Sequence, residues 1–232
     1  MKHPSSATIP GQGKRPVILA GIVFAFLLFF CVSLFLTPLL SPAHLSDHVL
    51  LYLSRLCFWA CTFIVYVYAV KAEKLPFLFW DEKKLAAPKY LLSVISILLI
   101  LLAVMALIAV VVKPLGINNK SAKLQEMVSV LRKDKWLLLF TCLTAAVTEE
   151  LVFRGYLIPR LQLFFKNPYP SLLISTALFG IAHISYGSVV QVVGPLYIGL
   201  IFALYYQKYR NIKVVMACHF LWDLLTLLIM TH

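Results

Sequence analysis

Long apolar stretches separated by short polar segments make up most of the 232-residue chain. A helix needs about 20 apolar residues to cross a bilayer. Stretches of about that length cover residues 17–40, 49–70, 90–112, 136–158, 171–187, 189–207 and 212–230. The pattern predicts an all-α, polytopic membrane protein with about seven transmembrane helices. The polar segment 113–135 carries apolar residues at helical spacing, which predicts a short amphipathic helix lying on the membrane. These residues are Leu124, Met127, Val128 and Leu131.

Composition agrees with a membrane protein. Apolar residues make up 62% of the chain, against about 45–50% in soluble domains. The net charge is +12, but of the 21 Lys and Arg residues only Arg55 and Arg154 lie well inside apolar runs. Basic residues confined to loops indicate topology and argue against nucleic-acid binding. The five cysteines all lie in apolar segments without a CxxC pair, so no disulfide framework is expected.

The distribution of charge also predicts domains and orientation. Residues 1–16 are polar and are expected to form a disordered tail, followed by transmembrane helices and basic loops over 17–135 and a polar-site region over 136–230. Placing the N-terminus in the cytoplasm puts 13 basic residues on the cytoplasmic side and six outside. This favours a cytoplasmic N-terminus. The six outside residues all lie in 113–135, so this segment opposes the assignment.

Two adjacent carboxylates and an arginine interrupt the fourth apolar stretch. A charged side chain near the centre of a bilayer costs roughly 2.5–3.5 kcal/mol on insertion scales, so such residues need a partner or a function. Glu150 and Arg154 are four residues apart and share one face of a helix, where they can pair. Glu149 is rotated by about 100° from Glu150. The spacing therefore predicts a structural Glu150–Arg154 pair and a Glu149 carboxylate that is available for chemistry.

Further polar residues occur in the fifth and seventh stretches. His219 and Asp223 are four residues apart, as are Phe179 and His183. Three helices that turned these faces inward would bring Glu149, His183, His219 and Asp223 around one buried cavity. Such a set could hold a divalent metal such as zinc, with His183, His219 and Glu149 as ligands. It could also activate a water directly, with Glu149 as the base. Asp223 could orient His219.

Three motifs in the same order resemble the CPBP family, which comprises type II CAAX prenyl endopeptidases and bacteriocin-processing or immunity (Abi) proteins. The motifs are Glu149-Glu150-Leu151-Val152-Phe153-Arg154, Phe179-Gly180-Ile181-Ala182-His183 and His219-Phe220-Leu221-Trp222-Asp223. The resemblance covers roughly residues 136–230. It implies an intramembrane endopeptidase that acts on a membrane-associated or prenylated peptide or protein in the lipid bilayer of a bacterial plasma membrane.

The resemblance also implies roles for single residues. By this resemblance, the catalytic residues would be Glu149, His183, His219 and Asp223, and the supporting residues would be Glu150, Arg154 and Phe179. Glu149 and His183 would activate the attacking water, while His219 and residue 223 would stabilise the oxyanion. Asp223 departs from the family, where prenyl endopeptidases carry Asn. An ionised Asp would repel an oxyanion, so Asp223 must be protonated, orient His219 or bind a metal.

Two other classes of function fit the same residues. A non-proteolytic immunity or scaffold protein would act by binding and would not need the Glu149 carboxylate. A proton-coupled transporter could use intramembrane carboxylates and histidines as a relay. The chain lacks the matching broken halves that many transporters show.

Overall fold

The structure is a computed structural model that describes residues 12–40, 44–112, 114–116 and 121–231. These residues form helices and no strand. The α-helices are α1 (Arg15–Leu40), α2 (Asp47–Tyr68), α3 (Ala87–Val112), α4 (Ala122–Lys133), α5 (Lys135–Thr144), α6 (Ile158–Leu161), α7 (Tyr169–Ala182), α8 (Val190–Tyr209) and α9 (Ile212–Thr231). The shorter elements are η1 (Gln12–Lys14), η3 (Ala69–Glu73), η4 (Ala145–Glu149), η5 (Leu151–Leu157), η6 (Gln162–Phe164) and η7 (Ile184–Tyr186).

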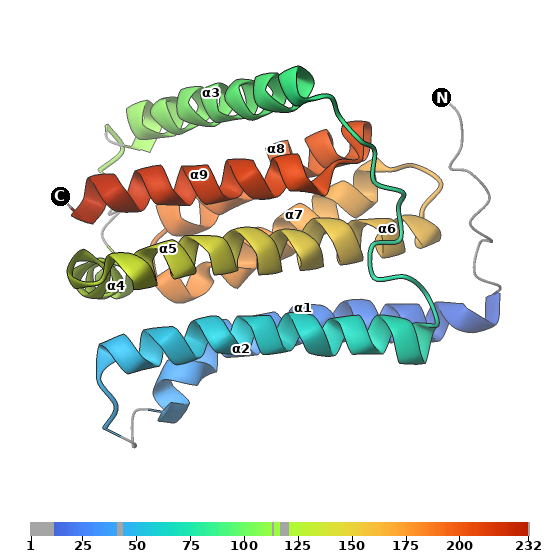
Figure 1. Ribbon diagram of the computed structural model, residues 1–232, viewed down its shortest axis with the longest axis horizontal. Helices are drawn as coiled ribbons and strands as arrows, with labels where there is room; N and C mark the ends of the chain where they lie inside the picture. Colours follow the sequence, from blue (N-terminus) through green and yellow to red (C-terminus); the bar gives the residue numbers. More distant parts are fainter. Residues whose placement is uncertain (1–11, 41–43, 113, 117–120, 232) are drawn as a thin grey trace.

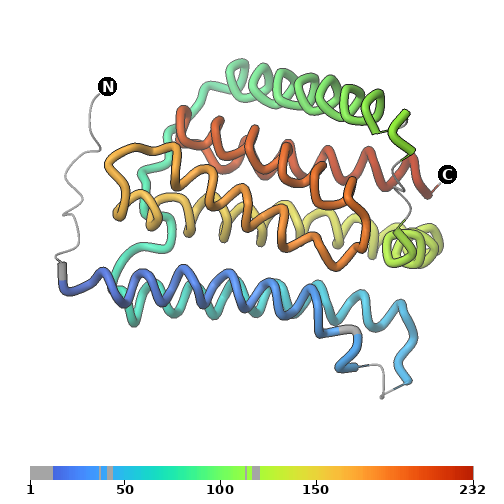
Figure 2. The backbone as a smooth tube through the Cα atoms, turned by 180° about the vertical axis from the view of Figure 1, so that it is seen from behind, coloured from blue at the N-terminus to red at the C-terminus, as the bar shows by residue number. Residues whose placement is uncertain are grey.

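The long helices run side by side as a bundle (Figure 1). The α1–α2 pair forms one side of the bundle and α3 forms the other, with α5 to α9 between them. Helix α4 is seen end-on in both views, so its axis is turned away from those of the other helices (Figures 1 and 2). The first and last described residues lie at opposite ends of the bundle. Because α5 to α9 lie between the α1–α2 pair and α3, the helices that carry the polar residues of the predicted site are enclosed by the N-terminal helices.

Six helices of the described chain are long and apolar enough to cross a membrane: Arg15–Leu36, Asp47–Glu73, Ala87–Val112, Lys135–Phe164, Val190–Tyr209 and Ile212–Thr231. The all-α membrane architecture is thus confirmed, but the count of seven is not. The predicted fifth span, 171–187, corresponds to α7, which has only 14 residues. The α-helix ends at Ala182, and His183 has a backbone conformation outside the helical region. The chain then turns at Gly187, which has φ of 69°.

Helix α4 corresponds to the predicted amphipathic helix, but its apolar face does not lie against the membrane. Val128 and Leu131 are buried against Leu137 of α5 and Leu227 of α9. This face is covered by the protein's own helices because α5 begins two residues after α4 ends and turns back against it. The prediction of a helix lying on the bilayer is therefore wrong for this face.

Asp134 connects α2, α4 and α5. Its Oδ1 accepts a hydrogen bond from the backbone N–H of Leu137 at 2.9 Å, which caps the start of α5. Its Oδ2 contacts His48 Nε2 at 2.7 Å and accepts a hydrogen bond from Tyr52 at 3.2 Å. The backbone N–H of Leu137 and then the His48 contact hold the pKa of Asp134 below its ordinary value. Asp134 thereby fixes where the fourth span begins.

The predicted tail 1–16 lies mostly outside the described residues. Within them, Gln12–Lys14 form η1 and α1 begins at Arg15, slightly before the predicted start at residue 17. The cytoplasmic N-terminus and the bacterial membrane stay predictions.

A buried ion pair joins the segment after α2 to the end of the fourth span. Arg160 Nε donates to Glu73 Oε2 at 2.7 Å, and both side chains are fully buried. Tyr156 donates to the other oxygen of Glu73 at 2.7 Å. Arg160 also donates to the carbonyl oxygens of Phe77 at 3.0 Å and Pro76 at 3.1 Å. The sequence gives no sign of this pair, because Glu73 and Arg160 both border basic loops.

We expect Arg160→Met to destabilise the fold strongly, because it leaves the Glu73 carboxylate buried without a counter-charge. Removing one partner of a buried pair typically costs about 3–5 kcal/mol. Thermal unfolding of detergent-purified protein would measure the loss. Lys133→Met, at an exposed position of α4, is the control and should unfold as wild type does. Equal stability of the two variants would contradict a stabilising role for Arg160.

Candidate active site

The two adjacent glutamates lie where the fourth span is not a regular α-helix. The π-helical turn η4 ends at Glu149, and a second one, η5, runs from Leu151 to Leu157. Wide turns of this kind inside a helix are often found at functional sites. The pairing predicted from the spacing is present, since Arg154 Nη1 donates to Glu150 Oε1 at 2.7 Å. The Glu150 side chain is fully buried, whereas that of Glu149 is 17% exposed.

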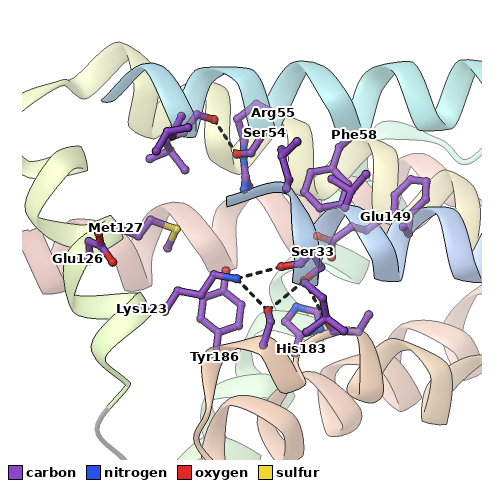
Figure 3. Close-up of a pocket in the computed structure, with 18 of the residues that line it drawn as sticks. Ser33, Ser54, Arg55, Phe58, Lys123, Glu126, Met127, Glu149, His183 and Tyr186 are labelled. Atoms are coloured by element: carbon purple, nitrogen blue, oxygen red, sulfur yellow. Dashed lines mark hydrogen bonds between the residues drawn. The ribbon is translucent and has the colours of Figure 1, made fainter. Parts of the chain in front are cut away.

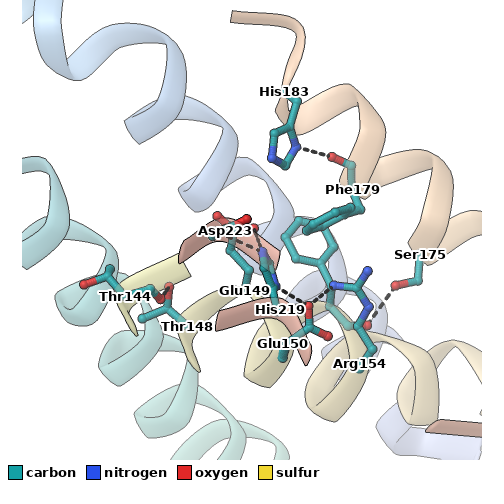
Figure 4. A network of polar contacts seen from close by, with 11 residues as sticks. Thr144, Thr148, Glu149, Glu150, Arg154, Ser175, Phe179, His183, His219 and Asp223 are labelled. Atoms are coloured by element: carbon teal, nitrogen blue, oxygen red, sulfur yellow. Dashed lines mark hydrogen bonds and ion pairs between the residues drawn. The ribbon is translucent and has the colours of Figure 1, made fainter. Parts of the chain in front are cut away.

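His219 of α9 is held by the same glutamate. Its Nδ1 contacts Glu150 Oε1 at 2.7 Å. Glu150 is paired with Arg154 and therefore ionised, and a carboxylate can only accept hydrogen bonds, so Nδ1 of His219 carries the proton. Nε2 faces the other way, 3.5 Å from Asp223 Oδ2 and 4.0 Å from Glu149 Oε2 (Figure 4). Glu150 thus orients the ring, and its free edge points towards Glu149 and Asp223.

His183 lies at the C-terminal end of α7. Its Nδ1 donates to the backbone oxygen of Phe179 at 2.8 Å, because a carbonyl oxygen can only accept. In the part of the chain that the structure describes, no hydrogen bond or ion pair links His183 to Glu149, His219 or Asp223. The structure therefore brings Glu149, His219 and Asp223 together directly, while His183 shares only the surrounding cavities with Glu149.

Phe179 supports the site through its ring. Arg154 Cζ lies 4.2 Å from the centre of this ring, in a cation–π contact. The Phe179 ring also makes edge contacts with Phe153 at 5.1 Å and with His219 at 6.2 Å between ring centres. Gly199 of α8 permits this approach, since an added Cβ would lie 3.0 Å from Phe179 Cδ1 and 3.2 Å from Arg154 Nη2. Helices α7 and α8 therefore position Arg154 together with its ionic partner Glu150.

Two cavities meet at Glu149 and His183. The wider one, about 470 Å³, lies among α1, α2, α4 and the turn after α7 (Figure 3). The narrower one, about 270 Å³, is lined by residues of α8 and α9, including His219 and Asp223. Glu149 and His183 line both. A substrate lying across the boundary between these cavities would have its chain beside the polar side chains.

Some polar atoms of the site are buried without a hydrogen-bond partner among the described residues. They are Glu149 Oε2, Glu150 Oε2 and Arg154 Nη2. A buried polar atom that has no partner carries a desolvation cost, so it invites a functional explanation. Glu149 Oε2 is the one that faces His219 and the narrower cavity. It is available to accept a proton from a bound water.

The side chains do not form a metal-binding set as they lie. In the described chain, no group of three His, Cys, Asp or Glu side chains is arranged so that it could hold a metal ion. Of the predicted ligands, His183, His219 and Glu149, both histidines already have their Nδ1 atoms hydrogen-bonded. Only the Nε2 atoms remain as nitrogen donors.

Sequence reasoning missed two residues of the wider cavity. Arg55 of α2 lines both cavities, although the sequence placed it inside an apolar run without assigning it to the site. Lys123 of α4 lines the wider cavity, although it lies on the polar side of a segment predicted only to be an amphipathic helix. A charged residue inside an apolar stretch was the only available signal, and it applied to Arg55 alone.

Residues 132–225 match a protein-family model described as type II CAAX prenyl endopeptidase Rce1-like. This match supports the CPBP/CAAX protease family for the matched region. The match includes all seven site residues named from the motifs and supports a CAAX-type intramembrane protease in general. No curated protein and no solved structure matches the chain. The first three spans lie outside the matched region.

We expect Gly199→Ala to impair the site more than the fold. The added methyl group must displace the Phe179 ring or Arg154, and overpacking of this kind costs about 1–3 kcal/mol. A displaced Arg154 no longer holds Glu150 and His219 in place, so activity should fall at least tenfold. Peptide cleavage and thermal unfolding would be measured together.

Gly13→Ala is the control for this substitution, because an added Cβ there meets no atom within 4 Å. Unchanged activity of Gly199→Ala would show that the positions of Phe179 and Arg154 do not matter for the chemistry.

Proposed function

We propose that the protein is an intramembrane endopeptidase that hydrolyses a peptide bond of a membrane-associated or lipid-anchored substrate. The observation that carries the proposal is the placement of His219. Glu150 fixes its Nδ1 at 2.7 Å, so that Nε2 faces the unpartnered oxygen of Glu149 beside a cavity. A base, a positioned hydrogen-bond donor and space for a peptide are the parts that amide hydrolysis requires. The match to prenyl endopeptidases adds support for a lipid-modified substrate.

In the proposed reaction, Glu149 takes a proton from a water molecule as the water oxygen attacks the carbonyl carbon of the peptide. Nε2 of His183 accepts a hydrogen bond from the same water and orients it. The carbonyl electron pair moves to oxygen, and the oxyanion accepts a hydrogen bond from Nε2–H of His219. The C–N bond then breaks, and Glu149 gives its proton to the leaving amine. The proton taken from the water thus ends on the leaving amine, and water is the only co-reactant.

This role requires His219 to carry protons on both nitrogens. Carboxylate oxygens surround its ring, with Glu150 at 2.7 Å, Asp223 at 3.5 Å and Glu149 at 4.0 Å. Negative charges at these distances stabilise a positive ring. Asp223 can therefore act through His219, as a group that holds the proton donor and does not face the oxyanion itself. This gives the Asp a function at a position where prenyl endopeptidases carry Asn.

Glu149→Gln should abolish cleavage, with a loss of at least about 10³-fold, because the amide cannot accept the proton of the attacking water. The substitution keeps the size of the side chain, so thermal unfolding should change little. The assay is cleavage of quenched lipidated peptides by detergent-purified protein. Processing retained by a folded Glu149→Gln protein would refute the proposal and would favour a protein that acts by binding.

We expect cleavage to withstand a strong chelator, because the described side chains do not form a metal-binding set. Purified protein would be incubated with the chelator and assayed beside a zinc-dependent protease as the positive control. Activity that is lost on chelation and restored by zinc would contradict direct activation of water by Glu149.

A further inference from the structure

The backbone on both sides of His183 is held by residues of α1 and α4 that lie outside the region that matches the protease family. Helix α7 ends one residue before His183, and the short turn η7 follows it directly. The His219 ring is fixed by the Glu150 carboxylate, whereas the His183 ring has one hydrogen-bond partner among the described residues, the carbonyl oxygen of Phe179. The direction of its free Nε2 therefore depends on where the chain lies at the end of α7.

Ser33 of α1 contacts the chain before and after His183. Its Oγ donates to the backbone oxygen of Ala182 at 3.1 Å, and it lies 3.0 Å from the Oγ of Ser185. The last carbonyl groups of a helix have no partner within that helix. Ser33 supplies such a partner for the final residue of α7, from a helix that is far away in the sequence. The end of α7 is therefore fixed against α1.

Lys123 of α4 begins a directed chain of hydrogen bonds to the same carbonyl group. Its Nζ donates to Ser185 Oγ at 3.1 Å and to the backbone oxygen of Ser33 at 3.0 Å. The Ser33 hydroxyl has one hydrogen, which it gives to Ala182. The Ser185 hydroxyl therefore donates to Ser33 and accepts from Lys123. An ammonium group, which only donates, suits the head of such a chain. The order of donors thus accounts for a lysine at this position.

The turn after His183 is held from the start of α4. Ser121 is the N-cap of this helix, and its Oγ donates to the backbone oxygen of Tyr186 at 2.6 Å. The Tyr186 ring lies nearly parallel to the imidazole of His183, with 6.1 Å between the ring centres and 19° between the planes. Lys123 Nζ lies 5.6 Å from the centre of the same tyrosine ring. Figure 3 shows Lys123, Tyr186, Ser33 and His183 close together beside the wider cavity.

We infer that Ser33 and Lys123 are positioning residues for His183, because they hold the backbone on either side of it and thereby set the direction of its Nε2. This inference rests on the proposed function, in which Nε2 of His183 orients the water that Glu149 activates. It adds to that function the residues that fix the orientation. Both act through His183, and they give α1 and α4 a part in the chemistry although neither residue lies in the matched region.

The first test observes the ring nitrogens of His183 by NMR of full-length, detergent-purified protein that carries ¹⁵N-labelled histidine. The spectrum of His183→Gln identifies the signals of this ring. Wild type should give one protonated Nδ1 and one unprotonated Nε2, since Nδ1 donates to Phe179. In Lys123→Met the two signals should move towards each other, because a ring that is held less firmly exchanges between its two tautomers. Identical signals in wild type and Lys123→Met would overturn the inference.

Ser33→Ala breaks the same chain of hydrogen bonds from α1 and should move the His183 signals in the same direction. It keeps the inference open to refutation if Lys123→Met does not fold. Lys133→Met and Ser129→Ala, at exposed positions of α4, are the matched controls and should leave the signals as in wild type. Signals of Ser33→Ala that equal those of wild type would overturn the role of Ser33.

The second test measures cleavage of quenched lipidated peptides. Lys123→Met should lower kcat about tenfold or more and leave KM nearly unchanged, because a misplaced group affects the chemical step. Lys123→Arg keeps a cation that only donates and should recover most of the activity. In a His183→Gln background, Lys123→Met should have little further effect, as expected when one residue acts through the other. Equal losses in the two backgrounds would overturn positioning through His183.

The two tests separate this inference from the proposed function. Ring signals that change in Lys123→Met, while wild type cleaves no peptide, would leave the placement of His183 by Lys123 standing and would remove the protease. Cleavage that is lost in Glu149→Gln but unaffected in Lys123→Met, with unchanged ring signals, would leave the protease standing and would overturn the positioning role.

Discussion

One carboxylate oxygen holds the candidate active site together. Oε1 of Glu150 contacts both Arg154 and His219 at 2.7 Å, and all three side chains are nearly inaccessible to solvent. The Glu150 carboxylate and the Arg154 guanidinium would each be costly to bury alone, so each depends on the other. Because His219 belongs to α9 and Glu150 to the fourth span, the same contact ties two transmembrane segments. The direction of the His219 ring follows from it.

The surroundings of this contact are shaped to fit it. The Phe179 ring covers one face of the Arg154 guanidinium, and Gly199 provides the space in which the two approach. Arg154 therefore needs a residue of α7 and a glycine of α8 as well as its ionic partner. Glu149, only one position from Glu150, faces two cavities, so chemistry and structural support are divided between neighbouring residues.

Much of this could be predicted from spacing within single helices. The four-residue separation of Glu150 and Arg154 predicted their pairing, and the apolar stretches predicted an all-α membrane protein. The bond between Glu150 and His219 depends on how α9 is rotated against the fourth span, which no local pattern encodes. The end of α7 at Ala182 depends on the turn that follows it. For this reason the apolar run 171–187 looked long enough to span, although its helix has only 14 residues. The apolar face of α4 fits lipid or protein equally well, so its partner could be learned only from packing.

The wide turns around Glu149 impose a constraint on chain length. Removing one residue from η4 would allow a regular helix to form, and every side chain beyond the deletion would turn by about 100° relative to those before it. Arg154 would then leave the Phe179 ring, and Glu150 would leave His219. Any redesign of this segment must therefore conserve the number of residues as strictly as the residues themselves.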